Sequence, residues 1–166
     1  MSSTDTLPAE LSGCMAAMAS DSRVYVRVGR FAEAAPDMTE LTIQIHELIA
    51  HVFDDPAWKR FFMAQEPLTP LSIEYSLEPI EVDEAAAFMV SVATSDIVWP
   101  QHRLMDSERA VHAAEQVVSS LGQDATWWTN HDSDCGATNS VTPVFDSLIA
   151  GTNGRVFAMM IQVADD

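Results

Sequence analysis

The chain has 166 residues, of which 48% are apolar and 20% are charged, and its formal net charge is -17. This length is typical of one domain, so we predict a single domain over residues 1–166, with residues 1–7 frayed. The apolar content excludes intrinsic disorder, which requires low hydrophobicity together with high charge. The negative charge disfavours direct binding to nucleic acid and to anionic membranes.

Cysteine usage and the N-terminal residues indicate the compartment. Cys14 and Cys135 are too few for a disulfide framework, so both thiols are expected to be reduced. Residues 1–5 lack the basic and apolar regions of a secretion signal, and no apolar run reaches the ~20 residues of a membrane span. The sequence therefore predicts a cytoplasmic protein.

The first third of the chain contains both helical and strand periodicity. We expect a helix over 8–20, a strand over 23–28, a helix capped by Asp37 or Thr39 that ends near Val52, and a short helix from Pro56. Asp55 followed by Pro56 is typical of an N-cap and a first helical position. Pro67 and Pro70 are expected to end the short helix.

The middle of the chain gives one clear helix and two less regular segments. Apolar and polar residues alternate over residues 71–77, which predicts a half-buried strand. Residues 80–94 are ambiguous, because their acidic, alanine-rich start favours a helix and their β-branched end suits a strand; we favour the helix. A helix is expected to start at Asp106 or Ser107 and to stop at Gly122, followed by a strand over 125–129.

The C-terminal residues carry the strongest hairpin signal in the chain. Two apolar strands, over 144–150 and 155–163, flank a turn that contains Asn153 and Gly154. Both strands are apolar on both faces, so we expect the hairpin at the centre of a sheet. We therefore predict an α+β fold, in which a mainly antiparallel sheet with a central C-terminal hairpin packs against three to five helices.

The charges are distributed unevenly along the chain, which has 25 acidic and 8 basic residues. Residues 61–102 and 110–154 contain no Lys or Arg. The carboxylates of these two stretches are Glu66, Glu74, Glu78, Glu81, Asp83, Glu84, Asp96, Glu115, Asp124, Asp132, Asp134 and Asp146. If they gather on one face, they form a negative surface that attracts a basic partner; if they are spread evenly, they serve only solubility.

No motif in the chain indicates a specific chemistry. His46 and His51 are five residues apart, whereas a helical zinc pair needs a spacing of four. The loop after His131 holds Asp132 and Asp134, which could bind calcium or magnesium, but aspartate is also an ordinary loop residue. We therefore predict no catalytic residue, no metal ligand and no cofactor.

Adjacent tryptophans and nearby carboxylates form the predicted contact site. Trp127 and Trp128 are neighbours in a strand, so their indoles point to opposite faces, and an exposed indole would anchor an interface. The predicted partner-binding residues are Trp127, Trp128, His131, Asp132, Asp134, Glu74, Glu78 and Glu81. The alternative is a sheet covered on both faces, in which both indoles are buried.

These observations favour a binding protein over an enzyme. We predict an acidic inhibitor or immunity-type protein that neutralises a basic protein partner, such as a toxin or an enzyme that handles nucleic acid. One alternative is a small enzyme, or a small-molecule or metal-binding domain, that uses the loop 131–135. A second alternative is a structural or assembly protein whose acidity serves solubility.

Overall fold

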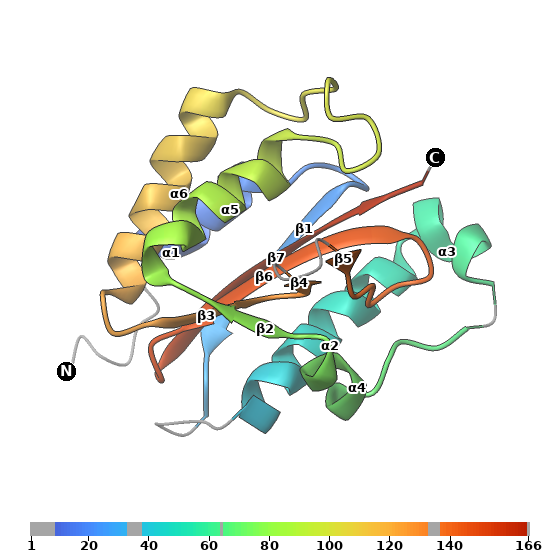
Figure 1. Ribbon diagram of the computed structural model, residues 1–166, viewed down its shortest axis with the longest axis horizontal. Coiled ribbons are helices and arrows are strands. Elements are labelled where there is room, and N and C mark those ends of the chain that lie inside the picture. Colours follow the sequence, from blue (N-terminus) through green and yellow to red (C-terminus); the bar gives the residue numbers. More distant parts are fainter. Residues whose placement is uncertain (1–8, 33–37, 64, 133–136, 166) are drawn as a thin grey trace.

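The computed structural model describes residues 9–32, 38–63, 65–132 and 137–165, and it consists of three layers (Figure 1). A five-stranded antiparallel sheet, in the order β1-β7-β6-β3-β2, lies between two groups of helices. The fraying predicted for residues 1–7 falls outside the described residues. No helix within the described ranges has the length and apolar character needed to cross a membrane.

The elements confirm the predicted α+β class. The helices of the described residues are α1 (Ala9–Met18), α2 (Met38–Asp54), α3 (Pro56–Phe62), α4 (Pro70–Tyr75), α5 (Val82–Thr94) and α6 (Ser107–Leu121). The strands of the sheet are β1 (Val24–Arg30), β2 (Glu78–Ile80), β3 (Thr126–Thr129), β6 (Phe145–Thr152) and β7 (Val156–Ala164). A separate two-stranded hairpin consists of β4 (His131–Asp132) and β5 (Ala137–Thr138). The described residues thus form six helices, which exceeds the predicted three to five.

The β6–β7 hairpin lies at the centre of the sheet, as predicted. Every residue of β7 is buried, because helices cover both faces of this strand. Val156 and Met160 pack with α1, α5 and α6 on one face. Phe157 and Ile161 pack with α2, α3 and α4 on the other face. The period-2 alternation of strand side chains thus divides the apolar residues of β7 between two cores.

The strand predicted over residues 71–77 is wrong, because these residues form most of α4 and the turn that follows it. Thr69 is the N-cap, and its hydroxyl accepts a hydrogen bond from the amide of Ser72 at 3.2 Å. Pro70 occupies the first helical position, where its missing N–H costs nothing. These two residues start α4, which the alternating pattern did not predict. It is the helix that the fold has in addition to the five predicted ones.

The helical conformation decides which side chains of α4 face solvent. Leu71 and Tyr75 are four residues apart and share one helical face, whereas a strand would have placed Ile73 beside them. Ile73 is buried in the core that α2 and α3 also form. Leu71 and Tyr75 consequently point away from that core and are exposed.

The ambiguous residues 80–94 form helix α5 from Val82 onward, as favoured. Met89 and Val92 lie on its buried face. Gln162 of β7 fixes the C-terminal end of α5, because its Nε2 donates to the carbonyl of Val92 at 2.7 Å. Its Oε1 accepts from the amide of Ile97 at 2.8 Å, so both ends of this buried side-chain amide are hydrogen-bonded.

Trp127 of β3 lies against the backbone of β6 because residue 151 is a glycine. The two residues pair across the strands, and a Cβ at Gly151 would overlap the indole ring. Trp127 is 1% exposed and is among the largest fully buried side chains of the described residues. A glycine in this central strand therefore makes room for a large core side chain.

Replacing Gly151 with alanine is expected to destabilise the protein by about 1–3 kcal/mol, because the added methyl group overpacks the site of Trp127. Urea denaturation followed by tryptophan fluorescence measures the loss. Gly13→Ala is the matched control, because a Cβ at Gly13 in α1 meets no atom within 4 Å and alanine is the better helix former by ~1 kcal/mol. Equal stability of the wild type and Gly151→Ala would contradict the close packing of Trp127.

Candidate functional site

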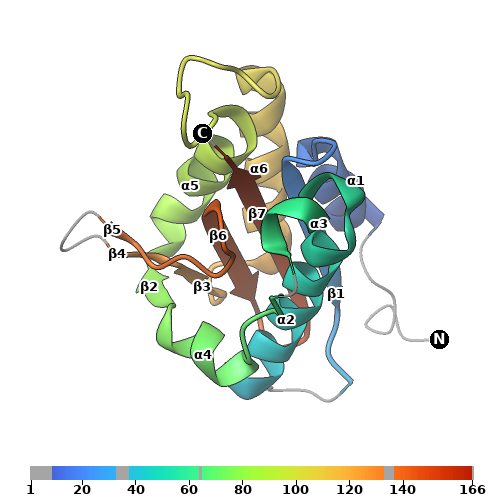
Figure 2. The same cartoon turned by 90° about the vertical axis from the view of Figure 1, so that its right-hand side faces the viewer.

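One edge of the sheet combines exposed apolar side chains with carboxylates. Helix α4 leads directly into β2, which is an edge strand of the sheet. Leu71 and Tyr75 on α4 are 60% and 80% exposed. We name the surface formed by Leu71, Glu74, Tyr75, Glu78 and Glu81 the acidic edge. Figure 2 shows α4 and β2 on the same side of the molecule as the β4–β5 hairpin.

Three of the predicted site residues belong to the acidic edge. Glu78 and Glu81 are exposed and Glu74 is half-buried. The sequence did not predict an exposed Leu71, because a strand over 71–77 would have turned this residue to the same side as Ile73. Thr69 as an N-cap followed by Pro70 was the signal that could have predicted a helix here, and with it the exposure of Leu71.

The tryptophan pair divides between the two faces of the sheet, as the strand position predicted. Trp128 is half-buried on the α2 side and is paired with Pro79 of β2. Trp127 is buried on the other side, so its indole leaves no surface for a partner. Within the described residues its Nε1 has no hydrogen-bond partner. Of the two tryptophans, Trp128 is therefore the one that keeps exposed surface.

The residues predicted after β3 are described in part. His131 begins β4, and its Nδ1 lies 3.1 Å from Oγ1 of Thr138 across the small hairpin. The side chain of Asp132 and the whole of Asp134 lie outside the described residues, so their contact roles stay predictions. Across the described ranges, no three His, Cys, Asp or Glu side chains converge as metal ligands would.

A cavity of about 460 Å³ lies beside His131, between α5 and the strands β6 and β7. Its lining includes three buried polar side chains, those of Asp96, Asp146 and Gln162. All three make hydrogen bonds within the protein. These groups are therefore occupied in holding the fold together, which weakens the alternative of a small-molecule site here.

Asp146 holds the segment between β5 and β6 against the end of β3. Asp146 is 2% exposed, and its carboxylate accepts hydrogen bonds from Nδ2 of Asn130 at 2.7 Å and from the hydroxyl of Thr142 at 2.7 Å. Burial raises the pKa of Asp146, although these donors and the backbone amides of Val141 and Thr142 oppose the rise. Asp146 thus supports a loop and does not face a partner.

Asp96 plays a similar internal role after α5. One carboxylate oxygen pairs with the guanidinium of Arg23, and the other accepts from the amides of Val98 at 2.9 Å and Trp99 at 3.0 Å. Burial opposes ionisation, but the hydrogen bonds from Trp99, Arg23 and Val98 outweigh it and lower the pKa of the Asp96 carboxyl below its usual range. Asp96 therefore fixes the chain between α5 and α6 to the start of β1.

The carboxylates of the two base-free stretches do not all lie on one face. Asp96 and Asp146 are internal, and Glu115 lies on α6, in the helical layer opposite α4. The carboxylates that remain exposed or half-buried around α4, β2 and the start of α5 are Glu66, Glu74, Glu78, Glu81, Asp83 and Glu84. The first stretch therefore supplies the acidic edge, whereas Glu115 and Asp146 of the second stretch lie elsewhere.

Comparison of the chain with protein-family models, with curated proteins and with solved structures gave no match. The functional argument therefore depends on the geometry of the described residues. Within them, the acidic edge is the surface where predicted site residues and exposed apolar side chains coincide.

Replacing Asp96 with asparagine is expected to lower the free energy of unfolding at neutral pH by about 1.5–3 kcal/mol, the usual contribution of hydrogen bonds to a charged group. The folded-state pKa of Asp96 is lowered, so its stabilisation is present above about pH 4 and is lost as the pH falls through that lowered pKa. The stability difference between wild type and Asp96→Asn should therefore shrink in acid. Urea denaturation at neutral pH and at about pH 3 measures it.

Asp146→Asn is a comparison with the opposite expected trend. The folded-state pKa of Asp146 is raised, so its stabilisation is complete below about pH 4 and is lost as the pH rises through the raised pKa. The stability difference between wild type and Asp146→Asn should therefore shrink as the pH rises towards neutrality. The same pH trend in both variants would refute the environments assigned to the two carboxyls.

Proposed function

We propose that this protein binds a basic protein through the acidic edge and neutralises it, in the manner of an acidic inhibitor or immunity-type protein. The observation that carries the proposal is the exposure of Leu71 and Tyr75 among the carboxylates of the acidic edge. An exposed aromatic side chain surrounded by polar groups is typical of an interface hot spot. Carboxylates also suit a surface that binds phosphates, such as that of a toxin or enzyme acting on nucleic acid.

The charge of the acidic edge supports rapid encounter with such a partner. Residues 61–102 contain no Lys or Arg, and three of the chain's 8 basic residues lie in or beside β1, at the other end of the sheet. A concentrated negative surface raises association rates well above the ~10⁵–10⁶ M⁻¹s⁻¹ of neutral pairs at low salt. The uneven charge therefore favours approach from the β2 side.

The apolar part of the acidic edge supports a long-lived complex. Leu71 and Tyr75 lose most of their exposed surface only if a partner covers α4, and burial of that surface is favourable. Trp128 lies in β3, beside β2, and this half-buried side chain adds to the aromatic surface. Charge sets the association rate of a complex, whereas buried aromatic anchors chiefly slow its dissociation.

The two alternative functions have less support from the geometry. The polar groups of the cavity beside His131 are occupied by hydrogen bonds within the protein. An oligomer that buries the tryptophan pair is disfavoured because Trp127 is already covered by its own chain. The acidic edge needs neither a ligand pocket nor a second copy.

The test begins with capture of the partner from a lysate of the native host on immobilised protein at low salt. Elution with rising salt and mass spectrometry identify basic proteins, and each candidate is then purified and its binding rates are measured. Tyr75→Ser is expected to weaken the complex about tenfold or more, mainly through faster dissociation. Glu74→Gln/Glu78→Gln should slow association and flatten its dependence on salt.

The matched control is Glu108→Gln/Glu115→Gln on α6, which removes the same number of charges from the opposite helical layer. This control should bind almost as the wild type does. Equal weakening by both double variants would mean that net charge alone drives binding, and the proposed surface would be wrong. Failure of the wild type to retain any basic protein at low salt would refute the function itself.

A further inference from the structure

Strand β1 forms the other end of the sheet and leaves backbone groups open along its outer side. Among the described residues, no strand lies beyond it. The amide of Val163 donates to the carbonyl of Arg23 at 2.9 Å, and the amide of Phe31 donates to the carbonyl of Arg155 at 3.0 Å. Odd-numbered residues of β1 are therefore those bonded to β7, since the direction of the peptide groups alternates along a strand.

The same alternation directs the N–H and C=O groups of Val26 and Val28 away from the sheet. Val24 has the same orientation, but its backbone groups are already bonded to Ser20. The open part of the edge is therefore the segment around Val26 and Val28. Unpaired strand edges of this kind are templates for another extended chain.

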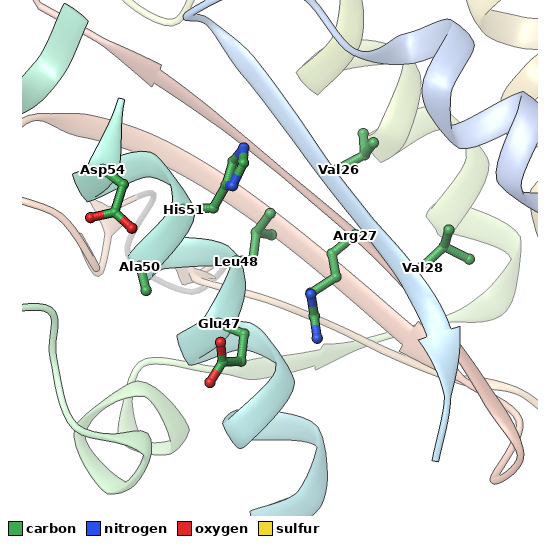
Figure 3. A pocket seen from close by; sticks show the side chains of 8 residues that line it. All are labelled: Val26, Arg27, Val28, Glu47, Leu48, Ala50, His51 and Asp54. Carbon is green, nitrogen blue, oxygen red and sulfur yellow. The ribbon is translucent and has the colours of Figure 1, made fainter. Parts of the chain in front are cut away.

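A groove of about 460 Å³ lies along this open segment, between β1 and the second half of α2. Figure 3 shows Arg27 extending from β1 towards α2, whereas Val26 and Val28 project to the other side of the strand. The helical wall of the groove is formed by Glu47, Leu48, Ala50, His51 and Asp54. The groove thus has a backbone edge on one side and a largely polar helix face on the other.

The two sides of an added strand would meet different surroundings. Side chains paired with Val26 and Val28 would lie next to two half-buried valines, which suits β-branched residues. The side chain opposite Arg27 would face a guanidinium that is bonded to Gln44 at 3.0 Å and 2.8 Å, which disfavours a basic residue there.

The next position on the α2 side lies opposite Tyr25, at the acidic end of the groove. The ring of Tyr25 is 6.0 Å from that of His51, and its hydroxyl donates to Asp55 at 2.6 Å. Asp54 lines the groove at the same end of α2 and is exposed. A lysine or arginine opposite Tyr25 would therefore meet carboxylates.

We propose that an extended segment of a partner protein adds to β1 as a further strand in this groove, with β-branched residues paired to Val26 and Val28 and a basic residue opposite Tyr25. The main-chain groups of β1 supply affinity, and the alternating side chains supply specificity. This binding surface goes beyond the proposed function, because the acidic edge lies at the opposite end of the sheet. A second copy of this chain is the less suitable occupant, since each copy carries a net charge of -17.

The test uses the peptide acetyl-Lys-Val-Ser-Val-Lys-amide and ¹⁵N-labelled full-length protein. The peptide reads the same in both directions, so it matches a parallel or an antiparallel strand. Titration followed by two-dimensional NMR should shift the amide signals of Val26 and Val28 and leave those of Tyr75 and Glu78 unchanged. Acetyl-Val-Lys-Ser-Lys-Val-amide, which has the same composition, should bind about tenfold more weakly or worse, because it exchanges the apolar and basic faces.

Val28→Pro and Val28→Thr are the decisive pair of variants. Proline removes the outward N–H without removing a bond to β7, so the sheet is preserved while strand addition is blocked. Threonine keeps the branched shape and the N–H. We expect a loss of peptide affinity of about tenfold or more in Val28→Pro and near wild-type affinity in Val28→Thr, with thermal unfolding confirming that both are folded.

Three outcomes would overturn the proposal. The first is equal binding of the two peptides, and the second is unchanged affinity in Val28→Pro. The third is concentration-dependent shifting of the Val26 and Val28 amides without peptide, which would assign the edge to a second copy of the chain. Because the readout is specific to β1, its failure leaves the proposal for the acidic edge untouched, and the reverse also holds.

Discussion

The two-sided apolar character of the β6–β7 hairpin is the constraint on which the rest of the fold depends. A strand that is apolar on both faces is stable only where each face is covered, so two helical layers are needed. Gln162 is the polar exception in β7, and it is tolerated because α5 satisfies its side-chain amide. With both faces of the sheet covered, its two edges remain as the places where strand backbone and rim side chains meet solvent.

The central features of the fold were predictable because they depend on local patterns. The Asn153–Gly154 turn and the flanking apolar runs placed the hairpin, and the apolar stripe from Ala110 to Leu121 placed α6. The strand prediction for residues 71–77 was wrong because so short an alternating pattern fits a strand or a helix equally well. Ile73 is buried in both interpretations, and the difference lies in the neighbours that become exposed.

The candidate site was predictable only in part, because burial of a polar group depends on distant residues. The opposite orientations of Trp127 and Trp128 followed from strand geometry alone. The burial of Trp127 depends on Gly151, which lies in another strand. Asp96 and Asp146 look like surface carboxylates in the sequence. In the fold both are buried, because Asp96 forms an ion pair with Arg23 and Asp146 accepts a hydrogen bond from Asn130. The open edge of β1 likewise follows from strand order, which no local pattern encodes.

The two ends of the sheet differ in what they present, and the spacing between them makes them independent. The β2 end is short and presents side chains, whereas the β1 end is longer and presents backbone groups. Four strand spacings of about 4.8 Å separate them by roughly 19 Å. That distance exceeds the Debye length of ~8 Å at physiological salt, so the exposed charges of one end are largely screened from the other end. A partner at one end should therefore leave the affinity of the other end unaltered, except at low salt, where the Debye length grows to ~30 Å and the charges of both ends act together.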